Sequence, residues 1–184
     1  GVNSVMQANH DPGRFVHAVT GWVDVEMGDF LDVHSYPAPN AASNPVNERI
    51  ASCGEFGGIN LFIDGHMWAG SDVNYTTVDD ADTYVNLYDR YTDRLQELQK
   101  EKGLWMSVYT QITDVEQECN GIMTYDRKVM KVSPAQFDGM KAKIMRTIDS
   151  RYKGEITVVA AADENPNIQW KYTTTEPQAD WFAT

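Results

Sequence analysis

The chain has 184 residues and a formal net charge of −12, from 27 acidic and 15 basic side chains. This length suits one domain with a sizeable core and is short for two. The acidic surplus repels phosphate backbones and anionic lipid, so we expect neither nucleic acid nor a membrane as partner. Its apolar runs are only a few residues long, so no transmembrane helix is expected.

Four short, mostly apolar segments predict the strands of a parallel sheet. In chain order they cover residues 15–19, 30–34, 50–54 and 106–110. None alternates cleanly between polar and apolar side chains, which is typical of a sheet covered on both faces. Helical patterns follow the last two strands, and strand–helix alternation favours parallel βα units of an α/β fold.

The clearer helical pattern covers residues 80–102. Its apolar side chains recur in steps of three and four and form one stripe: Tyr84, Leu87, Tyr88, Tyr91, Leu95 and Leu98. Thr77 with Asp80 predicts a capping box at its start. Gly103 stands where a helix commonly ends in a left-handed residue.

The second helical pattern covers residues 134–150. Ser133 as N-cap, Pro134 in the first turn and Gln136 two residues later predict its start. Its predicted core stripe is Phe137, Met140, Ile144, Met145 and Ile148. After it, residues 156–161 predict another strand, and the polar and aromatic stretch 165–184 has β-type composition. We therefore expect one domain over residues 1–155, and the start of a following β-sandwich domain or a linker over 156–184.

Candidate site residues follow the predicted strands, because α/β folds place function at the carboxyl ends of parallel strands. Glu55 stands out, since it has Gly54 before it and Gly57-Gly58 after it, which lets a substrate approach closely. A carboxylate that caps a turn or pairs with a buried arginine explains the same pattern. The accompanying candidates are Trp22, Asp24, His34, Tyr36, His66, Trp68, Tyr109, Gln111 and Asp114.

Metal and thiol chemistry are disfavoured. The four histidines have no helical pairing, and Asp32 and His34 are assigned to opposite sides of their strand, so we expect no metal site. Cys53 stands two residues before Glu55 and is expected on the same side of that strand. The sequence shows no base to activate Cys53 as a nucleophile.

Several motifs in order resemble one enzyme family. They are residues 32–37 (DVHSYP), 54–58 (GEFGG) and 109–116 (YTQITDVE), with 120–121 and 124–127 following. Across residues 11–127 the chain resembles glycoside hydrolase family 2, which includes β-galactosidases, β-glucuronidases and β-mannosidases. The resemblance implies an α/β fold that is a partial (β/α)₈ TIM barrel, in which the four predicted strands are strands five to eight.

By the same resemblance, Glu55 is the nucleophile of a retaining exo-β-glycosidase, and the remaining candidates position the sugar. The family's acid/base Glu lies on an earlier strand, upstream of residue 1, so the chain alone is expected to be inactive. No cofactor is implied. The alternative is a non-catalytic carbohydrate-binding or structural half-barrel of a larger protein. Open sheet edges predict self-association, and export to the periplasm or the cell exterior fits the family.

Overall fold

The computed structural model describes residues 13, 15–18, 21–42, 49–68 and 75–149, with side chains to Arg146. All of these residues belong to one compact unit, residues 1–152. The predicted second domain at 156–184 and its strand at 156–161 lie outside the described residues. Within the described ranges no helix combines the length and apolarity that a bilayer crossing requires.

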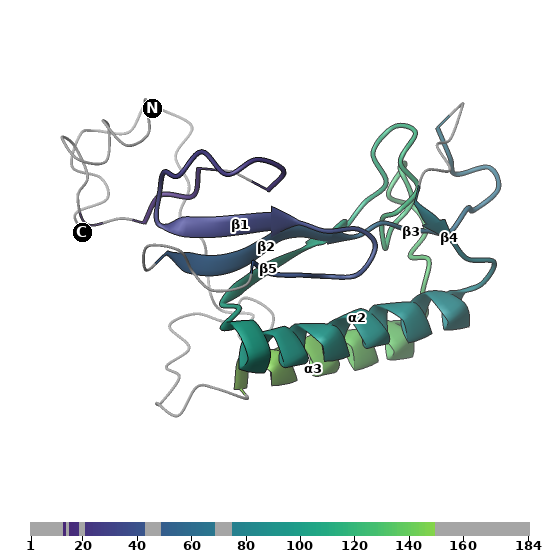
Figure 1. Ribbon diagram of the computed structural model, residues 1–184. Helices are drawn as coiled ribbons and strands as arrows, with labels where there is room; N and C mark the ends of the chain where they lie inside the picture. The colour runs from purple at the N-terminus through teal and green to yellow at the C-terminus, as the bar shows by residue number, and fades with distance from the viewer. Residues whose placement is uncertain (1–12, 14, 19–20, 43–48, 69–74, 150–184) are drawn as a thin grey trace, which may run out of the picture. The chain divides into compact units, whose positions relative to one another are not determined.

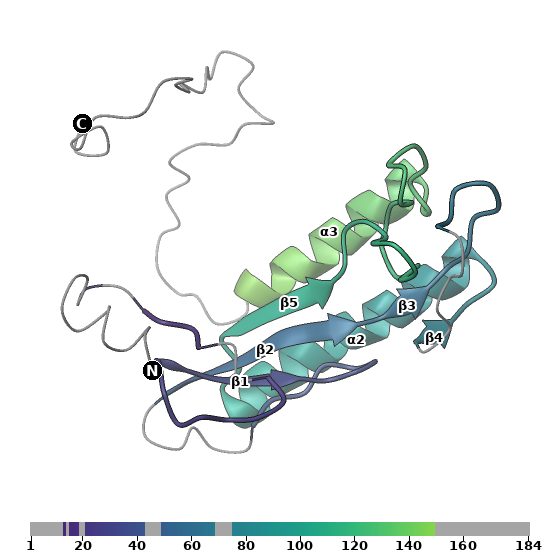
Figure 2. The same cartoon turned by 90° about the horizontal axis from the view of Figure 1, so that it is seen from above.

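The central sheet has three parallel strands, β1 (Phe30–His34), β2 (Ile50–Gly57) and β5 (Met106–Thr110), with β2 in the middle. Two short parallel strands, β3 (Ile59–Asn60) and β4 (Thr76–Thr77), form a separate sheet. Helices α2 (Ala81–Lys102) and α3 (Pro134–Asp149) pack side by side on one face of the central sheet (Figure 1; Figure 2). The strands predicted at 30–34 and 106–110 are confirmed, and the one predicted from 50 extends to Gly57.

The prediction of a partial (β/α)₈ barrel is wrong. Within the described part of the chain, the central sheet has three strands instead of four, and the segment between β1 and β2 contains no helix. Residues 15–18 are not a strand, although their composition is apolar. The Val16 carbonyl accepts from the Asp29 N–H at 2.8 Å, and the Val16 N–H donates to the Asp29 side chain at 2.6 Å. Because both main-chain groups of Val16 bind a single residue, the segment is held beside β1 without forming a ladder.

The helix ends follow local chemistry. Asp80 caps α2 by accepting the Thr83 N–H at 2.7 Å, and Gly103 ends the helix with a left-handed φ of 68°. Thr77 lies in β4, so the predicted capping box with Thr77 is wrong. At α3 the predicted cap is confirmed, because Ser133 and Gln136 exchange hydrogen bonds of 2.8 and 3.3 Å.

The core lies between the central sheet and the helices. From α2 it buries the predicted stripe Tyr84, Tyr88, Tyr91, Leu95 and Leu98, with Leu87 partly buried. From α3, Met140 is buried and Ile144 packs against the core, but Phe137 and Met145 are exposed. The α3 stripe is therefore narrower than predicted. The Ile148 side chain lies outside the described part.

Candidate functional site

A cluster of polar side chains surrounds Glu55 where β1 and β2 end. The Tyr36 hydroxyl donates a hydrogen bond to Glu55 Oε2 at 2.9 Å. His34 Nδ1 lies 3.3 Å from the same oxygen. The His34 side chain is 9% exposed and the Glu55 side chain 41%. The Glu55 carboxylate therefore contacts a nearly buried imidazole on one side and is open to solvent on the other.

A bulge in β2 turns Glu55 toward this cluster. On β1 the paired residues run from Asp32 to His34, while their partners on β2 run from Ser52 to Glu55. The pairing with β5 shows the same shift between Cys53 and Phe56, so β2 carries one extra residue here. A bulge of this kind reverses the alternation of side chains along the strand. Cys53 therefore lies in the helix-side core, and Glu55 emerges on the opposite side.

Asp32 is a site residue that sequence reasoning did not select. Its Oδ2 lies 3.3 Å from His34 Nε2, so Asp32 and His34 share one side of β1. Their assignment to opposite sides was wrong, because residues two apart on a strand face the same way. A Cβ on Gly54 would overlap the Asp32 carboxylate, and a Cβ on Gly21 would overlap the His34 ring. Gly21 and Gly54 were therefore the features of the sequence that could have indicated a close approach of side chains at this position.

Aromatic rings form a wall beside the carboxylate. Trp22 lies edge-on to His34, with ring centres 5.5 Å apart, and nearly parallel to Tyr36 at 6.5 Å. Tyr75, which sequence reasoning missed, packs against Tyr36 at 5.1 Å. Trp22 is 72% exposed, so most of its side chain is open to solvent. Burial, together with the hydrogen bond to Glu55 and its charge, raises the pKa of Tyr36 far above the ordinary value, although a hydrogen bond with Thr110 opposes this. Tyr36 therefore remains a hydrogen-bond donor.

Two predicted site residues face other parts of the molecule. Asp24 binds the guanidinium of Arg49, the residue directly before β2. Asp24 therefore lies at the amino-terminal end of the strands, opposite to the end that carries Glu55. Hydrogen bonds from Arg49 lower the pKa of Asp24. Tyr109 packs into the core, and its hydroxyl lies 2.7 Å from that of Tyr84. The contacts of Asp24 and Tyr109 are thus with Arg49 and Tyr84, and not with Glu55.

Another two predicted residues stabilise the loop after β5. Gln111 donates to Asn120 at 2.6 Å and to Glu118 at 3.2 Å. Asp114 is buried and accepts from Lys131 Nζ at 2.7 Å. Their polar groups are thus engaged within this loop.

The loop residues His66 and Trp68 contact the same region. His66 Nδ1 lies 2.8 Å from Asp126 Oδ2, and the Trp68 ring packs edge-on to Tyr125 at 4.8 Å. The hydrogen bond with His66, helped by those from Thr124 and the Lys128 N–H, lowers the pKa of Asp126 to about 2. These contacts tie the loop after β3 to the loop after β5.

The cysteines are buried free thiols. Cys53 is fully buried, and burial raises the pKa of its thiol to about 11, so it is a poor nucleophile at neutral pH. Among the described side chains, no three of His, Cys, Asp and Glu are grouped to hold a metal ion.

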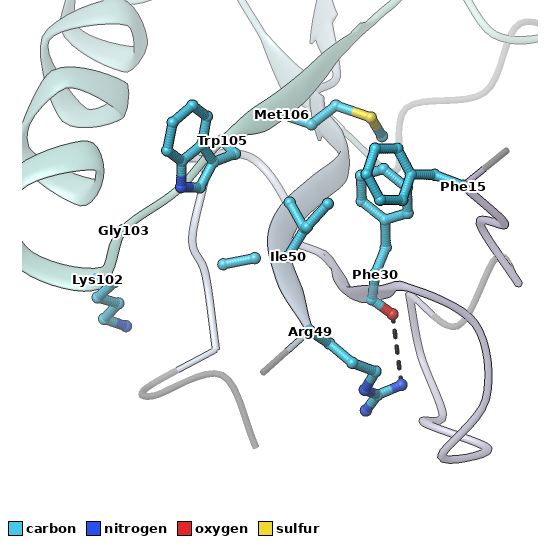
Figure 3. Close-up of a pocket in the computed structure, with 9 residues that line it drawn as sticks. Phe15, Phe30, Arg49, Ile50, Lys102, Gly103, Trp105 and Met106 are labelled. Carbon is cyan, nitrogen blue, oxygen red and sulfur yellow. Dashed lines mark hydrogen bonds between the residues drawn. The ribbon is translucent and has the colours of Figure 1, made fainter. Parts of the chain in front are cut away.

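A cavity of about 800 Å³ lies at the amino-terminal ends of the central strands, away from Glu55 (Figure 3). It is lined by the first residues of the three central strands, Phe30, Ile50 and Met106, together with Phe15 and Trp105. Its two cations are engaged: Arg49 binds Asp24, and Lys102 donates to Asn40 and the Ala41 carbonyl. The cavity is apolar and offers no reactive group, so the candidate site is the cluster around Glu55.

No protein-family model matches this chain, and no curated protein matches it.

Proposed function

We propose that the chain binds a β-glycoside beside Glu55 and that Glu55 is the nucleophile of a retaining glycosidase reaction. The observation that carries the proposal is the half-exposed carboxylate whose Oε2 accepts from the Tyr36 hydroxyl at 2.9 Å. It stands at the carboxyl edge of parallel strands, where α/β proteins bind ligands.

The contacts divide the roles of the two carboxylate oxygens. Tyr36 and His34 both approach Oε2, and none of the described residues makes a hydrogen bond or ion pair with Oε1. Oε1 is therefore the oxygen assigned to attack the anomeric carbon. Tyr36 orients the carboxylate before attack, because its hydroxyl donates a hydrogen bond to Oε2.

The exposed face of Trp22 supplies the binding surface. The C–H groups of a pyranose carry slight positive charge, and an aromatic face is negative, so a sugar stacks on Trp22 while its anomeric carbon faces Glu55. A retaining enzyme also needs a second carboxyl group about 5–5.5 Å from the nucleophile, to protonate the leaving oxygen. We assign that group to a residue outside this sequence.

The test uses a substrate that needs no protonation of its leaving group. The chain is incubated with 2,4-dinitrophenyl 2-deoxy-2-fluoro-β-glycosides of galactose, glucose, mannose and glucuronic acid. Dinitrophenolate leaves as a stable anion, and the fluorine slows hydrolysis of the glycosyl-enzyme. Intact-protein mass spectrometry is expected to show one added fluoroglycosyl group for one of these sugars, and peptide mapping is expected to place it on Glu55.

Two variants sharpen the result. Glu55→Gln is expected to abolish labelling. Tyr36→Phe is expected to slow it by about 10- to 100-fold, since a hydrogen bond to a charged group contributes about 1.5–3 kcal/mol. A folded chain that no reagent labels, or labelling that persists in Glu55→Gln, contradicts the proposed nucleophile. Sugar binding seen by saturation-transfer NMR without labelling would instead favour a non-catalytic carbohydrate-binding role.

A further inference from the structure

Asp32 is a buried carboxylate whose two oxygens have different surroundings. The residue is 4% exposed, and Oδ1 accepts from the Ser52 hydroxyl at 2.7 Å. His17 Nε2 also lies 3.5 Å from Oδ1. Oδ2 is buried and has no hydrogen-bond donor among the described residues, although His34 Nε2 lies 3.3 Å away. Most buried carboxylate oxygens in proteins accept a hydrogen bond, so the Oδ2 of Asp32, which accepts none from the described residues and lies beside an imidazole, is a candidate for a role beyond the fold.

Two glycines leave space for the Asp32 carboxylate and the His34 ring. Gly54, one residue before Glu55, leaves the space that the Asp32 carboxylate occupies, and Gly21 leaves the space of the His34 ring. The same imidazole therefore faces Asp32 with Nε2 and Glu55 with Nδ1, each at 3.3 Å.

We propose that Asp32 is a positioning residue for Glu55 and acts through His34; this rests on the function proposed above. The Asp32 charge holds the proton on His34 Nε2 and so fixes the ring. Nδ1 then carries a lone pair and repels Glu55 Oε2 toward the Tyr36 hydroxyl, which donates to it, and these two contacts restrict the rotation of the carboxylate. Oε1 is left facing the sugar, and Asp32 itself does not touch the substrate.

One readout is independent of any activity. Long-range ¹H–¹⁵N NMR spectra of the full chain report which ring nitrogen of each histidine carries a proton, and His34→Asn assigns the His34 signals. Nε2 is expected to be protonated in the unmodified chain. In Asp32→Asn the amide oxygen stays with Ser52, so the amide N–H faces Nε2, which must then accept. The Nε2 proton is therefore expected to be lost.

The second readout is the labelling reaction with the fluoroglycoside. Asp32→Asn is expected to lower the rate constant at saturating reagent by about ten- to a hundredfold, the scale that misplacement of a reacting group produces. The reagent concentration for half-maximal rate is expected to stay nearly unchanged. Asp93→Asn, the same change at an exposed aspartate on α2 that pairs with Lys143 at 2.9 Å, is the control and should leave the His34 signals and the rate unaltered. Ser52→Ala removes the bond to Oδ1 alone and should also keep the rate.

The outcomes separate the two proposals. If the unmodified chain is labelled on Glu55 and Asp32→Asn is labelled equally fast, the positioning role is overturned while the nucleophile stands. An unprotonated Nε2 in the unmodified chain also overturns it, even where Asp32→Asn does not fold. If the unmodified chain is never labelled, the proposed function fails and the role of Asp32 falls with it.

Discussion

Loss of the Lys131 charge should destabilise the fold strongly. Lys131 and Asp114 form an ion pair of 2.7 Å, with side chains 0% and 1% exposed. Lys131 Nζ also donates to the Cys119 carbonyl at 2.8 Å, and Asp114 Oδ1 accepts the Gly121 N–H at 2.8 Å. In Lys131→Met the carboxylate keeps one backbone donor and loses its counter-charge.

The expected cost follows from that burial. Removing one partner of a buried pair costs about 3–5 kcal/mol, a large part of the roughly 5–15 kcal/mol that holds a domain folded. With an m-value of about 2 kcal/mol per molar urea, the unfolding midpoint should fall by roughly 2 M. Chemical denaturation followed by tryptophan fluorescence measures this. Lys128→Met is the control, because Lys128 is 74% exposed and 3.8 Å from Asp126, and should change stability by less than about 0.5 kcal/mol.

The pH dependence gives a second check. Burial raises the pKa of Asp114, and Lys131 opposes that rise, so Lys131→Met should raise it further. A carboxyl whose folded pKa exceeds its unfolded value of about 3.9 stabilises the fold at low pH and loses that contribution as pH rises through the folded value. The stability deficit of Lys131→Met should therefore grow from about pH 4 upward. A deficit below about 1 kcal/mol at pH 7, or one independent of pH, refutes the reasoning.

Three further outcomes are expected. The Asp126 carboxyl should titrate near pH 2 by carbon NMR, and in His66→Ala the midpoint of this titration should rise toward about 4. Any stability that the ionised Asp126 adds is present above about pH 4 and is lost as pH falls through about 2. An unshifted midpoint in the variant contradicts this. Cys53 and Cys119, both buried, should resist iodoacetamide at pH 8 until urea unfolds the chain, and rapid native labelling contradicts their burial. The chain should self-associate in sedimentation velocity, and Trp105→Arg, at a residue that is 74% exposed, should weaken association; a monomer at all concentrations opposes it.

The sequence by itself determined the elements whose signals are local. The α2 apolar stripe, the Gly103 stop and the Ser133–Gln136 cap each depend on residues within a few positions, and the structure contains all three. It also named Glu55 and Tyr36 as separate site candidates, and the structure joins them by a hydrogen bond. Apolar composition alone did not settle residues 15–18, because their hydrogen bonds go to Asp29.

Only the tertiary structure decided where side chains from distant segments meet. In the sequence, Asp24 and Asp114 were candidates of the same kind as His34, because each is a polar residue near the end of a predicted strand. In the structure, Asp24 binds Arg49, which is 25 residues away in the chain, and Asp114 binds Lys131, which is 17 residues away. The single extra residue in β2 separates Glu55 from Cys53, and that register exists only against the neighbouring strands. The described segments likewise form a sheet of three strands, because pairing between distant backbones, and not local composition, determines which segments join it.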